Sequence, residues 1–133
     1  MKKSNKQFDF RTITSFEKAC EKTNTPEVIP DVSTFPERFR KPIVAVYKLF
    51  VIFEAINDGW TAEMGDGSQI KYYPGLPVLS SGCGFDHSHY DFAITFTAVG
   101  SRLCTDTAEK AIFIGEQFGV LGQEYKDFFL NKT

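Results

Sequence analysis

The chain has 133 residues, of which 42% are hydrophobic and 24% charged, and its formal net charge is −2. A chain of this length fits a single domain that buries about two thirds of its unfolded surface without disulfides or a metal. The composition excludes a largely disordered protein, and the small negative charge excludes a general attraction to nucleic acid or to an anionic membrane.

The first eleven residues are basic. They hold four cations and one acid, namely Lys2, Lys3, Lys6 and Arg11 against Asp9, so this end carries +3 and the rest of the chain −5. We predict a flexible, solvated basic arm over residues 1–13, although its charge also suits a nucleic-acid contact, and a single domain over residues 14–133. No apolar signal sequence follows the lysines and no C-x-x-C pair occurs, which predicts a cytoplasmic, reduced protein.

Two helices are predicted next. Thr14-Ser15-Phe16-Glu17 has the capping-box form and predicts a short helix over residues 15–22, followed by an extended connection that contains Pro26 and Pro30. A second helix is expected from Pro36, capped by Ser33 or Thr34.

The stretch Ile43–Ile56 is apolar except at Lys48 and Glu54, which predicts a central helix that is buried on most sides. It is too short and too charged to span a membrane. We expect Pro42 to kink or break the helix for one turn, and Asn57-Asp58-Gly59 to end it.

From Trp60 the hydrophobic period changes to two. Trp60–Met64 and Ile70–Tyr73 are predicted to form a hairpin around Gly65-Asp66-Gly67, and the segment Ile70–Leu79 to be an edge strand or one broken in two by its prolines. The residues 92–99 are predicted to be a central strand, and 102–104 the start of a returning strand.

A long C-terminal helix is predicted from a cap at Thr105, Asp106 or Thr107 to about Leu130, packed through small residues on the central helix. Phe113 and Val120 lie off its apolar face, where we expect them to be exposed. The predicted fold is therefore α+β, with two N-terminal helices, an antiparallel β-meander of three to four strands and one long C-terminal helix, all helices packed on one sheet face.

The open sheet face is the first candidate site. Alternation along the predicted strands places five side chains on it: Lys71, Tyr73, Thr95, Thr97 and Arg102. Two cations and an aromatic ring could form a platform for single-stranded nucleic acid. The same face could instead bind a protein partner. A solvated polar sheet face without any ligand explains the residue pattern as well.

A second candidate is the cluster Cys83, His87 and His89, which offers metal ligands within seven residues. Its spacing matches no standard zinc motif, and a polar loop explains the same residues. A Cys83–His87 nucleophile and base is disfavoured because Asp86 and Asp91 would raise the pKa of the thiol. We therefore expect no enzyme activity, no cofactor and no metal.

Three groups of residues carry a family resemblance: Lys71-Tyr72-Tyr73-Pro74, Gly82-Cys83-Gly84-Phe85 and Val99-Gly100-Ser101-Arg102-Leu103-Cys104. With these the chain resembles a group of small uncharacterised proteins of Bacteroides-type gut bacteria and their phages. Those relatives have an aromatic pair where this chain has Gly75-Leu76. The resemblance implies a phage or mobile-element setting and a cytoplasmic host, and it transfers no catalytic residue.

These observations predict a protein that acts by binding and without catalysis. A protein partner is the first expectation, single-stranded nucleic acid the alternative, and a small enzyme or metal-binding protein the third. No membrane contact is expected, and a homo-oligomer stays open.

Overall fold

The computed structural model describes residues 7–63, 68–74, 78–79, 82–83, 90–93 and 101–120. The described elements are the 3-10 helix η1 (Phe10–Thr12), α1 (Phe16–Thr23), α2 (Glu37–Asn57), β1 (Lys71–Pro74), β2 (Val78–Leu79), β3 (Gly82–Cys83), β4 (Tyr90–Ala93), the 3-10 helix η2 (Ser101–Leu103), α3 (Ala108–Ile114) and the π-helical segment η3 (Gly115–Val120).

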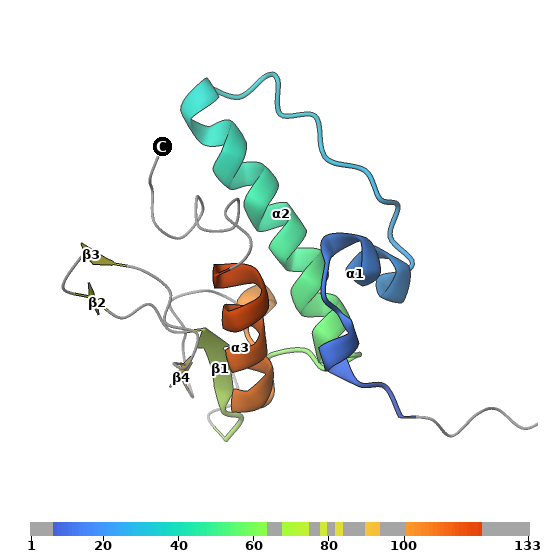
Figure 1. The fold of residues 1–133 in the computed structure, drawn as a ribbon, viewed down its shortest axis with the longest axis vertical. Coiled ribbons are helices and arrows are strands. Elements are labelled where there is room, and N and C mark those ends of the chain that lie inside the picture. The colour runs from blue at the N-terminus through green and yellow to red at the C-terminus, as the bar shows by residue number, and fades with distance from the viewer. Residues whose placement is uncertain are drawn as a thin grey trace, which may run out of the picture.

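The long helix α2 is the central element, as the sequence predicted (Figure 1). Its C-terminal half supplies most of the hydrophobic core: Leu49, Val51, Ile52, Phe53, Ala55 and Ile56 are buried. They pack with side chains from η1, α1, η2 and α3 in one cluster. The N-terminal turns of α2 are exposed or half-buried, so the helix is buried at one end only.

Local capping sets the ends of α1. Ser15, one residue later than predicted, is the N-cap, and its Oγ accepts a hydrogen bond from Lys18 N at 3.1 Å. The predicted apolar face of Phe16, Ala19 and Cys20 is confirmed, since all three are buried against α2. Asn24 ends the helix in the left-handed conformation, with φ at 57°.

Of the two alternatives predicted at Pro42, a kink or a one-turn break, the break is wrong. The helix α2 runs through Pro42 without interruption, because residues on both sides of the proline keep their helical conformation. The predicted caps Ser33 and Thr34 are also not used, since Pro36 precedes the first turn and no side chain caps it. The predicted end at Asn57 is confirmed, with Asp58 in the left-handed region and Gly59 at a φ of 95°.

Residues 7–13, which the sequence assigned to the arm, contain η1 and contribute to the core. Ile13 is buried, and Phe8 and Phe10 pack against the core cluster. The Lys22 ammonium lies 4.1 Å from the centre of the Phe8 ring and 2.7 Å from Asp58 Oδ1, so it joins this segment to the ends of both α1 and α2.

The predicted α+β fold with a meander of three to four strands is wrong. The described part of the chain is mainly helical, and its strands form two separate antiparallel pairs, β1 with β4 and β2 with β3. The pairing is not sequential, because β2 and β3 lie between β1 and β4 in the chain. The helices do not share one sheet face either: α1 packs on α2, whereas α3 packs on β1 and β4.

The predicted hairpin fails for a local reason. Residues 60–63 form no strand; instead the side chain of Gln69 bonds to their backbone, with Oε1 accepting from Glu63 N at 2.6 Å and Nε2 donating to Thr61 O at 3.4 Å. The expected returning strand at Arg102–Cys104 is largely the 3-10 helix η2. Residues 64–67 and 94–100 lie outside the described residues.

The last helix begins where predicted, because the Thr107 hydroxyl accepts a hydrogen bond from Lys110 N at 3.2 Å. It changes from α to π geometry at Gly115, and residues 121–133 lie outside the described part. Phe113 is not exposed as expected: it is half-buried, and its ring meets that of Phe10 edge-on at 5.5 Å. The main packing surface of α3 is the β1–β4 pair, not the predicted central helix. No helix in the described ranges is long and apolar enough to cross a membrane.

Candidate functional site

The structure separates the predicted sheet-face residues that it describes. Lys71 is 0% exposed, and its Nζ donates a hydrogen bond to Gln69 O at 3.0 Å. Its neighbour Ile70, predicted to face inward, is 42% exposed. Arg102 is exposed but lies on η2, and Tyr73 lies in β1 opposite Asp91. Thr95 and Thr97 lie outside the described residues, and so do the metal candidates His87 and His89.

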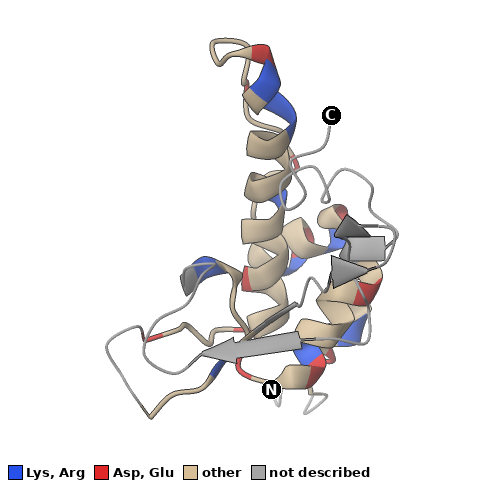
Figure 2. Ribbon diagram, turned by 90° about the vertical axis from the view of Figure 1, so that its left-hand side faces the viewer, with Lys and Arg blue, Asp and Glu red and all other residues tan. Residues whose placement is uncertain are grey.

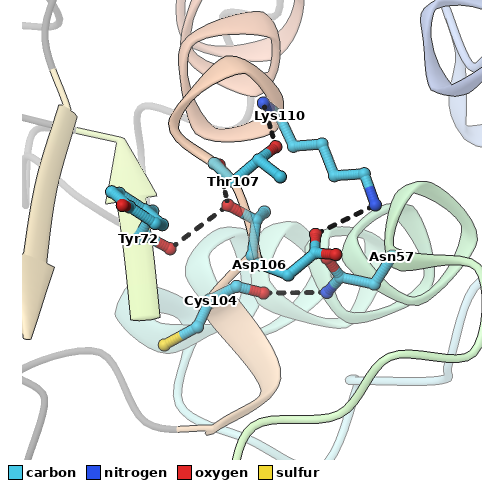
Figure 3. A network of polar contacts seen from close by, with 7 residues as sticks. Asn57, Tyr72, Cys104, Asp106, Thr107 and Lys110 are labelled. Carbon is cyan, nitrogen blue, oxygen red and sulfur yellow. Dashed lines mark hydrogen bonds and ion pairs between the residues drawn. The ribbon is translucent and has the colours of Figure 1, made fainter. Parts of the chain in front are cut away.

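A network of polar contacts holds η2 and the start of α3 in place (Figure 3). Thr105 and Tyr72 exchange two backbone hydrogen bonds, at 2.7 and 3.0 Å, on the edge of β1. Asn57 Nδ2, at the end of α2, donates to Cys104 O at 2.8 Å. Asp106 pairs with Lys110 at 2.9 Å. Because residues 103–105 are buried and bonded on both sides, Arg102 projects from a fixed backbone.

A cleft of about 470 Å³ opens beside the C-terminal half of α2. Four of its lining residues recur on one face of that helix at spacings of 3, 4 and 3, namely Tyr47, Phe50, Glu54 and Asn57. Trp60, Thr61 and Ala62 continue the wall after the helix ends, and Thr25, Val51 and Arg102 complete it. Three aromatic rings therefore line the cleft, with one acidic and one basic side chain.

The two charges of the cleft do not pair with each other. Among the described residues, no hydrogen bond or ion pair engages the Glu54 carboxylate or the Arg102 guanidinium, and both residues are exposed. Opposite charges within about 4 Å would ordinarily form a contact ion pair. Both groups are therefore available to a ligand.

A second feature is an exposed apolar surface, which we call the rim: Val28, Ile29, Phe35 and Phe39. These side chains are between 42% and 64% exposed, and they lie in or next to the connection from α1 to α2. Single exposed apolar residues are normal on protein surfaces. Four large ones within twelve residues of sequence make this stretch a candidate interaction surface.

Hydrogen bonds fix the backbone of the rim near its α2 end. Arg40 reaches back from α2 and donates from Nε to Phe35 O at 2.9 Å and from Nη2 to Ser33 O at 3.0 Å. Asp31 Oδ1 accepts from Ser33 N at 3.0 Å. Bonds from the backbone N–H and then the side chain of Ser33 lower the pKa of the Asp31 carboxyl. The carboxylate that holds this turn is therefore ionised at neutral pH.

Cations lie at the α2 end of the rim, in a stretch that also carries the exposed acids Glu27, Asp31 and Glu37. Figure 2 shows Lys and Arg gathered on the first turns of α2, where Arg38, Arg40 and Lys41 lie. The helix dipole favours acids at this end, so these cations do not serve to stabilise α2. The presence of Arg40 at this end of α2 is explained by its hydrogen bonds to the connection between α1 and α2. The Arg38 guanidinium lies 4.5 Å from the centre of the Phe39 ring, and Lys41 is exposed.

Reactive groups are not brought together in the described residues. Cys20 is buried, and this burial, with Glu27 and Glu17 adding, raises the pKa of its thiol, which suits an inert cysteine. Cys83 lies in β3. Over the described ranges, no group of three or more His, Cys, Asp or Glu residues is placed to hold a metal ion.

Both features had signals in the sequence that the reasoning missed. Val28-Ile29 stands between two prolines, where neither a helix nor a strand ladder can bury it. The cleft face of α2 mixes aromatic and polar residues at helical spacing, but the helix was interpreted as buried all round. Comparison with protein-family models, curated proteins and solved structures finds no match to this chain.

Proposed function

We propose that this protein acts by binding a protein partner through the rim, and that the partner presents an apolar patch edged with acidic residues. The observation that carries the proposal is that four large apolar side chains are exposed along one connection, whose backbone at Ser33 and Phe35 is held by Arg40. An ordered surface loses little conformational entropy on association, so more of the contact energy is retained as affinity.

Charge indicates the chemistry of the partner. Arg38 and Lys41 flank the rim at the end of α2 where the helix dipole disfavours them. Acidic groups around the partner's apolar patch would complement these cations and accelerate association. We place the binding event in the cytoplasm of a phage-associated host, as the sequence resemblance implies.

The alternative of a single-strand platform on the sheet is less well supported. It required Lys71 and Arg102 to contact phosphates side by side, and Lys71 is fully buried. Arg102 then remains as the one described cation of that proposed platform, and a single contact gives little affinity at physiological salt.

The test compares the wild-type protein with one double variant in the rim and one control variant outside it. Tagged wild-type protein and the double variant I29S/F39S are used to retain proteins from an extract of the source organism. A protein that binds the wild type is then purified, and its Kd is measured by calorimetry. We expect the double variant to weaken binding at least tenfold, because exposed apolar anchors dominate such contacts.

The control is I70S, which removes another exposed apolar side chain outside the rim. It should bind like the wild type. Equal binding by I29S/F39S and I70S would contradict the proposal. So would retention of nuclease-sensitive nucleic acid, or a change of oligomeric state in I29S/F39S by analytical ultracentrifugation, since the rim would then contact a second copy of this chain.

A further inference from the structure

We propose that the cleft beside α2 binds a free α-amino acid with an aromatic side chain. This site is separate from the rim and goes beyond the proposed function. Its volume of about 470 Å³ is within the range of about 300–1,000 Å³ that is typical of small-molecule sites.

The aromatic residues define the apolar part of the ligand. Tyr47 and Phe50 lie one turn apart on α2, and Trp60 lines the cleft just beyond the end of that helix. A planar ring can stack on or meet these side chains edge-on, which is the favourable geometry for aromatic pairs. Phe50 is 38% exposed, so a ligand ring would cover apolar surface that now faces water.

The charges define the polar part. The exposed Glu54 carboxylate and the exposed Arg102 guanidinium line the same cleft and are not paired with each other. A carboxylate fits the planar fork of a guanidinium, and an ammonium group fits a carboxylate. A ligand that carries both charges satisfies both side chains, whereas an anion alone would face the repulsion of Glu54.

The backbone supports this arrangement. Glu54 lies on α2 three residues before the buried Asn57, and Arg102 precedes the buried segment that Asn57 bonds through Cys104 O. The two charged groups are thus mounted on elements joined by a buried hydrogen bond. A pre-formed site of this kind does not have to be ordered by its ligand.

The single tryptophan of the chain, Trp60, reports directly on the cleft by its fluorescence. Three probes that share the aromatic side chain but differ in their charged groups are titrated up to about 10 mM: L-phenylalanine, N-acetyl-L-phenylalanine without the ammonium, and L-phenylalaninamide without the carboxylate. We expect L-phenylalanine to change the emission and to bind at least tenfold more tightly than either blocked form. Calorimetry confirms the stoichiometry.

Two exposed side chains can be changed without disturbing the core. E54Q and R102A should each weaken the binding of L-phenylalanine at least tenfold. N-acetyl-L-phenylalanine should lose little further affinity in E54Q, and L-phenylalaninamide should lose little further affinity in R102A. R11A, a cation outside the cleft, is the matched control and should behave as the wild type. Absence of L-phenylalanine binding, equal binding of all three probes, or unchanged binding in R102A or E54Q would overturn the proposal. Because the rim is unaltered in these variants, failure here leaves the partner test unaffected.

Discussion

At Asn57 a single amide joins two parts of the fold that are far apart in sequence. Its Nδ2 donates to Cys104 O at 2.8 Å, and the residue is buried at the end of α2. Loss of this donor leaves a buried carbonyl without its partner, which costs about 1–3 kcal/mol. Asp106, two residues beyond Cys104, belongs to the same network of polar contacts, so a negative charge added at position 57 enters a network that already holds a carboxylate (Figure 3).

We therefore predict that N57D destabilises the protein by at least about 3 kcal/mol at pH 7, more than N57A does. Burial raises the pKa of the introduced carboxyl, so it binds a proton as the pH falls and regains a donor. The loss of unfolding free energy caused by N57D should then become smaller between pH 7 and about 4.5, while the loss caused by N57A stays nearly constant. Urea unfolding at both pH values measures this. Parallel pH profiles for N57D and N57A would contradict it.

Among the elements, α1 offers a direct comparison of two adjacent hydroxyl residues. Ser15 caps the helix through its Oγ, whereas Thr14, the residue first predicted to do so, precedes the cap. We expect S15A to lower the free energy of unfolding by about 1 kcal/mol and T14A by less than about 0.5 kcal/mol. Thermal unfolding of the two variants decides which hydroxyl is the cap. A larger effect of T14A would reassign it.

The helices could be predicted, as could the break of the segment Ile70–Leu79 into two strands, but the pairing of the strands could not, for a physical reason. Helix signals are local: the apolar spacing of Phe16, Ala19 and Cys20 and the stop at Asp58-Gly59 act within one or two turns. The pairing of strands is set by distant segments, such as Thr105 on the edge of β1. If the alternation of side chains along a strand is shifted by one residue, the buried and the exposed side chains exchange faces. This explains why Lys71 is buried although it was predicted to be exposed.

The candidate sites follow the same division. Arg102 was predicted to be exposed and is exposed, but its neighbours in space come from α2 and from residues 60–62, which no local pattern connects to it. The rim depends on the reach of Arg40 over seven residues to Ser33 O. The alternation of residues along a strand could predict neither the surroundings of Arg102 nor the position of the rim.

Over the whole molecule, stability should be unevenly distributed along α2. Its residues from Leu49 to Ile56 are largely buried, whereas those from Glu37 to Val44 are exposed or half-buried and include Pro42. Slow amide exchange requires opening of the packed part, while the outer turns open locally. We predict protection factors at least about tenfold higher in the C-terminal half, measured by hydrogen exchange with mass spectrometry. Uniform protection along the helix would contradict it.

Because the rim is exposed, the tendency of this protein to associate depends on its concentration as well as on its structure. Four apolar side chains that are held outward remain adhesive when no partner covers them, and encounters between two copies increase with the square of concentration. Surplus chains would therefore precipitate or be degraded, while chains covered by the proposed partner would stay dispersed. Balanced synthesis of the two proteins would then be a condition for keeping either one usable in the cell.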